Sequence, residues 1–286
     1  MSNQTDNSDV NENDAMNTEV TESKKTGFWS LPNDSIVKTF GVALLLCLFC
    51  SIIVSGSATI LKPKQVKNRQ LDVQKNILAV AGLTDDSVSV EERFNKIEVA
   101  IVDIETGEYT DAIEDAQAYD QRKASKDPKQ NVSLSKDDDL AQIGSRAKYG
   151  KVYLMRDGEA LSKVIIPVKG YGLWSTLYGF IAIEADGNTI SDITFYEHNE
   201  TPGLGGEVEN RGWQQVWHGK KLFNDAGEPA FTVAKGKASA DSVHDVDGLA
   251  GATLTSVGVM NLVRFWIGEN GFGPYLKKLA QNAGAN

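Results

Sequence analysis

The sequence predicts an α+β protein, in which a single N-terminal transmembrane helix is followed by an antiparallel-sheet domain with flanking helices. Three observations predict this class: a charge-free apolar stretch near the N-terminus, alternating apolar segments separated by Asp-Gly turns after residue 150, and an apolar helical pattern near the C-terminus. The 286 residues suffice for one large or two small domains with a sizeable core.

The N-terminal part divides into a polar tail and an apolar stretch. The first 26 residues are almost all polar and cannot bury enough apolar surface to order themselves, so we expect a disordered tail over residues 1–35. No charged residue occurs from Thr39 to Leu61. A helix rising ~1.5 Å per residue crosses a ~30 Å hydrocarbon layer over such a length. We predict an uncleaved transmembrane helix over residues 36–61, because a cleaved signal peptide has a shorter apolar core nearer the N-terminus.

Both cysteines, Cys47 and Cys50, lie in the apolar stretch. The rest of the chain therefore has neither a disulfide framework nor a cysteine metal site. Three positions apart on a helix, the two side chains face one direction. They are either packing residues or ligands of a cluster shared with another membrane subunit. Lysines flank the stretch on both sides, so the charge pattern leaves the orientation undecided.

Residues 62–145 are expected to form a helical and acidic linking region. Residues 66–81 have apolar positions at helical spacing and end at Gly82, which is a C-terminal signal. Residues 88–99 are interpreted as a second, short helix. Residues 103–139 are acidic, rich in lysine and poor in apolar residues, which predicts an exposed excursion outside the core.

The folded domain is expected over residues 146–286. Apolar runs and alternation predict strands, and the Asp-Gly turns favour antiparallel pairing. The predicted strands are residues 151–156, 161–170, 179–185, 189–200 and 231–236. A helix is predicted from Thr255 to Glu269, because the apolar residues between Val259 and Trp266 fall on one face. Trp213 and Trp217, also at helical spacing, are expected to pack in the core.

Composition and spacing exclude several functions. The formal net charge is −10, without a basic cluster that would follow a phosphate backbone, so nucleic-acid binding is not expected. The three histidines do not have the spacing of a metal site. The sequence has no serine in a nucleophile elbow and no phosphate-cradling Gly-Lys-Ser/Thr loop.

The most informative stretch runs from Asp247 to Ser256 and reads DGLAGATLTS. It is a loop of small residues that brings hydroxyl groups to the start of the C-terminal helix. Gly248 and Gly251 allow backbone conformations that a Cβ atom resists. A phosphate is stabilised at such a helix start, because free N–H groups and a partial positive charge lie there. The alternative is an ordinary Ser/Thr cap after a glycine turn.

This stretch resembles the flavinylation motif that FAD:protein FMN transferases recognise. Those enzymes transfer the phosphate of FMN to the last threonine of the motif, which is Thr253 here. Asp247 belongs to the recognition pattern, and Gly251 and Ala252 match its following positions. The fourth motif position is usually Ser or Thr, whereas this chain has Ala250. That departure removes a hydroxyl other than the acceptor and leaves the attachment point unchanged.

Two further segments resemble flavin loops of the NqrC family, the C subunits of the Na+-translocating NADH:quinone reductases. They are VKGYGLWS at residues 168–175 and HNETPGLG at residues 198–205. The resemblance implies a covalent FMN, joined by a phosphoester bond to Thr253. Apolar side chains would cover its ring, glycines would allow close backbone approach, and a lysine would neutralise the phosphate. The residues expected at the cofactor are Gly170, Leu173, Trp174, Glu200, Thr201, Leu204, Gly205, Lys235, Thr253, Leu254 and Thr255.

The resemblance also implies a function and partners. A member of this family relays single electrons through its FMN within a translocase of the oxidoreductase type, and it has no catalytic acid or base of its own. The implied partners are the other subunits of a six-subunit NADH:quinone reductase, including a second FMN subunit and an iron–sulfur membrane pair. An FAD:protein FMN transferase would be needed for maturation. The implied location is the bacterial inner membrane, with a periplasmic C-terminal domain and a cytoplasmic tail.

Two alternatives remain. The G subunit of the Rnf-type ferredoxin:NAD+ complexes uses the same type of motif, but the longer chain and the GYGLWS segment favour the quinone reductase. A membrane-anchored ligand-binding or sensory domain without a cofactor belongs to a different class. A flavin that remains on the chain after denaturation distinguishes the electron carrier from that domain.

Overall fold

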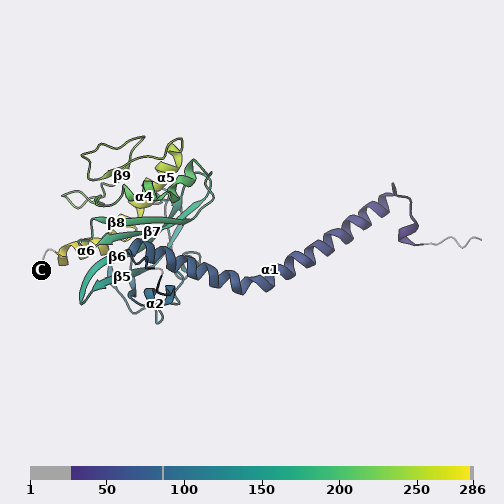
Figure 1. Ribbon diagram of the computed structural model, residues 1–286, viewed down its shortest axis with the longest axis horizontal. Helices are drawn as coiled ribbons and strands as arrows, with labels where there is room; N and C mark the ends of the chain where they lie inside the picture. The colour runs from purple at the N-terminus through teal and green to yellow at the C-terminus, as the bar shows by residue number, and fades with distance from the viewer. Residues whose placement is uncertain (1–26, 86, 284–286) are drawn as a thin grey trace, which may run out of the picture. The chain divides into compact units, whose positions relative to one another are not determined.

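The computed structural model describes residues 27–85 and 87–283 (Figure 1). The chain divides into two compact units, residues 1–64 and residues 65–286. The predicted disordered tail lies mostly outside the described residues, and its described end contains a short 3₁₀ helix, η1, at Phe28–Ser30. The fold class is confirmed, because a long apolar helix precedes an antiparallel sheet with helices.

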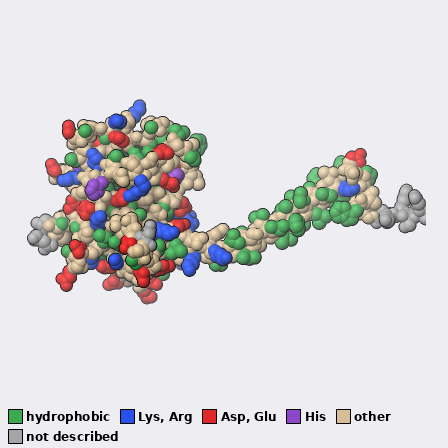
Figure 2. Space-filling model, in the orientation of Figure 1, with side chains coloured by type: hydrophobic (Ala, Val, Ile, Leu, Met, Phe, Trp, Pro, Cys, Tyr) green, Lys and Arg blue, Asp and Glu red, His purple; other side chains and the backbone are tan. Residues whose placement is uncertain are grey.

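Helix α1, Ile36–Ala81, contains the predicted transmembrane helix. By length and composition it is able to cross a membrane, and hydrophobic side chains line its surface (Figure 2). The helix continues beyond residue 61 and includes the predicted helix at residues 66–81. It ends where Gly82 adopts a φ of +81° and the Leu83 N–H donates to the Leu78 carbonyl oxygen, which is a glycine C-cap.

The second unit contains a six-stranded sheet in the order β2-β1-β5-β6-β7-β8. All neighbouring strands are antiparallel, as predicted. The four long predicted strands are confirmed, with ends that differ by a few residues. The strands are β1 Ile97–Asp103, β2 Glu108–Tyr109, β5 Tyr149–Asp157, β6 Ala160–Tyr171, β7 Thr176–Glu184 and β8 Ile190–Glu197.

Side chains alternate between two hydrophobic cores on the two faces of this sheet. On one face, Val164, Ile166 and Val168 of β6 belong to the core that also includes the C-terminal helices. On the other face, Ile165 packs in a second core with Ile77 and other residues of α1. The C-terminal end of α1 is thus part of the sheet domain.

Residues 88–99 were expected to be helical, and this prediction is wrong in its second half. Helix α2 covers only Val90–Phe94, and β1 begins at Ile97. Asn95 and Lys96 end the helix, and the following apolar run pairs with β5 along its whole length, from Ile97 opposite Met155 to Asp103 opposite Tyr149. Sheet pairing therefore outweighed local helical spacing. The linking region contributes a strand to the sheet.

The region 103–139 was expected to be an exposed excursion outside the core, but part of it packs against the sheet domain. It contains helix α3, Gln121–Ala124, and strand β3, Asn131–Ser133, which pairs with β4, Ser145–Ala147. Ala124 and Ser125 are buried. The guanidinium carbon of Arg122 lies 3.4 Å from the centre of the Tyr178 ring, which fixes α3 against β7. The hydrophobic pattern of the sequence did not predict this packing, because the contact depends on one arginine in a segment with few apolar residues.

The C-terminal part carries the predicted helix and one that was missed. Helix α5, Thr253–Ile267, begins two residues earlier than expected, and α6, Gly273–Ala283, follows it with Tyr275 and Leu276 buried. The segment before α5 contains η2 Gly205–Glu209, α4 Arg211–Gln215 and a small parallel pair of β9 Thr232–Val233 with β10 Asp245–Val246. Trp217 is fully buried, which confirms its place in the core.

Candidate functional site

Thr253 is the first residue of α5 and is exposed. Ala252 occupies the N-cap position, and no side chain caps the helix there. The first-turn N–H groups of a helix have no partner within the helix, and the helix dipole adds a partial positive charge. Thr253 thus presents its hydroxyl at a helix start that can stabilise a phosphate.

The loop before α5 is held by bonds to neighbouring segments. The Asp247 carboxylate accepts a hydrogen bond from the Ala238 N–H at 2.8 Å. The backbone carbonyl oxygen of Asp247 accepts another from Trp213 Nε1 at 2.7 Å. The Ser256 hydroxyl accepts from the Leu249 N–H and donates to the Ala252 carbonyl oxygen. These contacts give Asp247 a structural role in setting the position of the loop.

Glu200 joins three segments of the candidate site. Its Oε1 atom accepts hydrogen bonds from the backbone N–H groups of Leu173, Trp174 and Ser175, at 3.0, 2.9 and 3.2 Å. Its Oε2 atom accepts a bond of 2.8 Å from the hydroxyl of Thr255 in the first turn of α5. Glu200 is only 5% exposed. One buried carboxylate therefore sets the relative positions of both predicted flavin loops and of α5.

These bonds determine the charge state of Glu200. Burial disfavours the charged carboxylate and acts to raise its pKa, but the hydrogen bonds from Trp174, Thr255, Leu173 and Ser175 outweigh this effect. The pKa of Glu200 is consequently held below its usual value. The side chain is an anion at neutral pH, and the bonds described above use both of its oxygens.

Two glycines allow this close packing around Glu200. A Cβ atom on Gly172 would lie 2.6 Å from Glu200 Oε1, and one on Gly205 would lie 2.6 Å from Thr255 Oγ1 and 2.7 Å from Glu200 Oε2. All three distances are below 3.0 Å, so a side chain at either position would force Glu200 or Thr255 to move. The glycines of the two loops are thus required by the buried carboxylate.

Apolar side chains beside these loops are exposed. Trp174 is 66% exposed, Leu254 61% and Leu204 44%. Leu204 lies against the motif loop, since its Cδ2 atom would be 3.0 Å from a Cβ on Gly251. Exposed large apolar groups around a helix start fit a site for a flat aromatic ring with a phosphate at one end.

The structure brings most of the predicted site residues together and sets others apart. Leu173, Trp174, Glu200, Gly205 and Thr255 are linked by the Glu200 bonds and contacts, and Leu204 lies against the loop of Thr253. Gly170 is instead a packing position, where a Cβ atom would lie 2.7 Å from Leu262 Cβ. Thr201 and Lys235 are exposed, and no contact in the described part of the chain joins them to Thr253.

Sequence reasoning missed three polar residues that support the loops. The Ser175 hydroxyl accepts a hydrogen bond from the Asn199 N–H at 2.7 Å. His198 Nδ1 accepts one from the Glu200 N–H at 3.1 Å. Ser256 closes the motif loop as described above. Their signal in the sequence was their place inside the three motif segments, where short polar residues form local backbone bonds.

Comparisons with known proteins agree with this geometry. Residues 172–268 match the family described as FMN-binding domain. A relative from Vibrio anguillarum, named as the C subunit of the Na(+)-translocating NADH-quinone reductase, is 55% identical over 248 residues, which are 86% of this chain and 96% of the relative. A relative of the same name from Yersinia pestis is 48% identical over 256 residues, 88% of this chain and 96% of the relative.

Solved structures show the same fold. The crystal structure of Shewanella oneidensis NqrC has a TM-score of 0.66 at 33% identity and covers 73% of this chain and 96% of that one. The crystal structure of the corresponding C subunit from Parabacteroides distasonis has a TM-score of 0.58 at 29% identity, covering 77% and 96%.

The fold and the matched region, which contains half of the first flavin loop, the whole second loop and all of α5, define a protein with an FMN-binding domain. The chain belongs to the NqrC family, the C subunits of the Na+-translocating NADH-quinone reductases. It is thus one subunit of an oxidoreductase complex, and the resemblance seen in the motifs is confirmed.

Proposed function

We propose that this subunit carries FMN covalently, through a phosphoester bond to Thr253, and relays single electrons within the reductase. The observation that carries the proposal is the exposed Thr253 hydroxyl at the uncapped start of α5, beside exposed apolar side chains. The bound FMN supplies reversible one-electron chemistry, which no side chain in the two loops offers. No residue of this chain is assigned a catalytic acid or base role.

Attachment proceeds by transfer from FAD. The Thr253 oxygen forms a bond to the phosphorus on the FMN side of the pyrophosphate, and the bond from that phosphorus to the bridging oxygen breaks. AMP leaves, and the hydroxyl proton goes to solvent. The first-turn N–H groups of α5 stabilise the phosphate that remains. Thr253 is exposed, so a transferase can reach it.

The residues around Thr253 would hold the flavin ring. Leu173, Trp174, Leu204 and Leu254 would cover its apolar faces. Glu200 keeps the 173–175 loop in place and acts through that loop, because its oxygens already bind the chain's own donors. Lys235, an exposed cation before the motif loop, is proposed to neutralise the phosphate.

The subunit is proposed to work with the other members of a six-subunit NADH:quinone reductase. Electrons would pass between an iron–sulfur membrane pair and a second FMN subunit, and an FAD:protein FMN transferase would act during maturation. We propose that α1 anchors the chain in the inner membrane with the sheet domain in the periplasm. Protease added to spheroplasts should then digest the sheet domain. Protection of that domain would instead indicate that it lies in the cytoplasm.

The decisive experiment is fluorescence of the chain under ultraviolet light after denaturing electrophoresis of native membranes. The wild-type band should fluoresce, and Thr253→Ala should be dark, because the acceptor oxygen is gone. Ser239→Ala, which removes an exposed hydroxyl from the loop before the motif, should fluoresce like wild type. A dark wild-type band would support a domain without a cofactor. A fluorescent Thr253→Ala band would show that the flavin is attached at another residue.

A further inference from the structure

The chain folds back on itself before the membrane stretch. Helix η1 and the residues up to 35 precede α1, and they belong to the same compact unit as the first part of α1 (Figure 1). The Ser35 N–H donates to the Pro32 carbonyl oxygen, and the Thr39 N–H donates to the Ser35 carbonyl oxygen, so a turn leads directly into the helix. We call residues 27–35 the N-terminal cap.

Lys38 fastens the N-terminal cap to the first turn of α1. Its Nζ atom donates to the Leu31 carbonyl oxygen at 2.8 Å and to Asn33 Oδ1 at 2.7 Å, and it lies 3.5 Å from the Trp29 carbonyl oxygen. These three acceptors match the three donors of an ammonium group. Lys38 is the last charged residue before the charge-free run that starts at Thr39. The cap therefore supplies polar partners to a charge at the edge of the apolar stretch, where water is scarce.

The aromatic residues of the cap reach the apolar stretch itself. Phe28 lies against Gly41, where a Cβ atom would overlap the Phe28 ring. The Trp29 ring packs edge-on against the Phe28 ring, with 5.5 Å between the ring centres. Phe28 is half-buried, whereas Trp29 keeps 74% of its surface exposed. A large aromatic side chain thus stands exposed beside the first turns of α1.

The length of the apolar stretch places these rings at the boundary of the bilayer. As a helix rising ~1.5 Å per residue, the run from Thr39 to Leu61 is roughly 35 Å long, slightly more than a ~30 Å hydrocarbon layer. Gly41 is the third residue of this run, so it lies within about one turn of the boundary. Since Phe28 contacts Gly41 and Trp29 packs on Phe28, both rings lie near that depth. Tryptophan is enriched there, because its ring is apolar and its N–H is polar.

We propose that the N-terminal cap lies in the headgroup region of the phospholipid bilayer, with the Trp29 ring among the lipids. The occupant of the exposed Trp29 surface is lipid, because the cap lies beside the start of the membrane stretch and oxygen atoms of the chain already bind the Lys38 ammonium. The proposal rests on the proposed membrane anchoring by α1. It is independent of the flavin bond at Thr253.

Tryptophan quenching by brominated lipids tests the position of Trp29. The full-length chain is reconstituted into vesicles of phosphatidylethanolamine and phosphatidylglycerol. These vesicles also contain a phosphatidylcholine brominated near the glycerol end or near the methyl end of its acyl chains. Bromine near the glycerol end should quench more strongly, because it lies closer to the depth of Trp29. Trp29→Phe should lose most of this quenching, whereas Trp174→Phe, which removes the other strongly exposed tryptophan of the described residues, should keep it.

Two glycine variants of α1 test the fold of the cap. Gly41→Ala places a methyl group in the Phe28 ring, so the cap should detach, and the difference in quenching between the two bromine depths should shrink. Gly56→Ala is the matched control on the same helix, because no heavy atom of the described chain lies within 4 Å of its Cβ position. It should behave like wild type. Equal quenching in the two variants would overturn the folded cap.

Vesicle flotation separates failure of the anchor from failure of the cap. A chain that does not float with the lipid would overturn both the anchor and the cap. A chain that floats, but whose fluorescence is unchanged by bromine, would overturn the cap alone and leave Trp29 in water. Stronger quenching from the methyl end would place Trp29 deep in the hydrocarbon layer and overturn the interfacial position.

Discussion

The Thr255 hydroxyl donates a hydrogen bond of 2.8 Å to Glu200 Oε2, and both side chains are buried. Thr255 lies two residues after the proposed attachment point, and Glu200 also binds the backbone of the 173–175 loop. The position of the helix start and the positions of both loops thus depend on one carboxylate. Four predictions test this arrangement and its surroundings.

Two substitutions of Glu200 should distinguish how much its charge and its hydrogen bonds contribute to stability. Glu200→Ala leaves three N–H groups and one hydroxyl without their acceptor, so the free energy of unfolding should fall by about 2–4 kcal/mol. Glu200→Gln keeps Oε1 and should lose less than Glu200→Ala. Urea denaturation measures both, with Glu159→Ala at an exposed turn as the control. Equal losses in Glu200→Ala and Glu159→Ala would contradict the structural role.

The same carboxylate should make stability depend on pH. The folded-state pKa of Glu200 is below its ordinary value of 4.5. Its contribution is therefore fully present above that ordinary value and is lost as the pH falls through the lower folded-state value. Thermal unfolding of wild type and Glu200→Gln should converge as the pH falls from about 6 to about 3. Parallel curves over that range would show that Glu200 does not titrate as described.

Gly205→Ala should damage the site by crowding. The added methyl group would lie 2.6 Å from Thr255 Oγ1 and 2.7 Å from Glu200 Oε2, so one of these groups has to move. We expect a loss of about 1–3 kcal/mol in the free energy of unfolding and a change in visible circular dichroism of bound flavin. Gly206→Ala, whose nearest neighbour would be at 3.1 Å, is the matched control. The idea fails if both variants behave alike.

The two arginines that share Glu197 should contribute unequally. Arg69 is 61% exposed at its side chain, so Arg69→Ala should cost less than about 1 kcal/mol of unfolding free energy. Arg122 is better buried, stacks on Tyr178 and bonds to Tyr196. Arg122→Ala should therefore cost about 2–3 kcal/mol. Denaturant titrations of both variants decide the order, and a larger loss for Arg69→Ala would reverse our interpretation.

Local patterns predicted the elements whose burial follows a simple period. The strands β5 to β8 and helix α5 have apolar residues at a period of two or near four, and the Asp-Gly turns indicated antiparallel pairing. Strand β1 was missed because its pairing partner β5 begins some 46 residues later, from Asp103 to Tyr149, and no local signal records such a contact. Helix α6 was not predicted, because glycines at residues 271 and 273, at its start, are unfavourable in helices.

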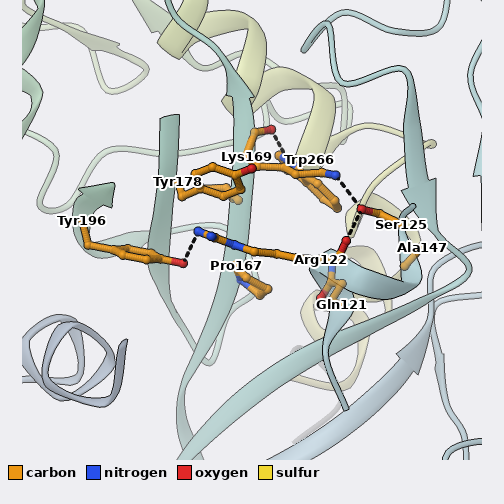
Figure 3. Close-up of a pocket in the computed structure, with 10 residues that line it drawn as sticks. Gln121, Arg122, Ser125, Ala147, Pro167, Lys169, Tyr178, Tyr196 and Trp266 are labelled. Atoms are coloured by element: carbon orange, nitrogen blue, oxygen red, sulfur yellow. Dashed lines mark hydrogen bonds between the residues drawn. The ribbon is translucent and has the colours of Figure 1, made fainter. Parts of the chain in front are cut away.

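The candidate site was predictable as three segments, but its internal bonds were not. Thr253, Glu200 and Leu204 were named because they lie in motif segments. That Glu200 binds the chain itself, rather than standing free for a ligand, depends on the approach of a loop 25 or more residues away in sequence. Lys169, in contrast, lies inside a motif segment, yet it lines a small cavity together with Arg122 (Figure 3).

Helix α1 has a consequence for soluble fragments of this protein. Its last residues, including Ile77 and Leu78, fill the second core against β6 and β7, and the compact unit begins at Gln65. A truncation placed after Ala81 would strip that face of the sheet and leave Ile165 and Phe180 uncovered. Water-soluble versions should therefore start near Gln65, so that the membrane stretch is removed while the part of the helix that completes the domain is kept.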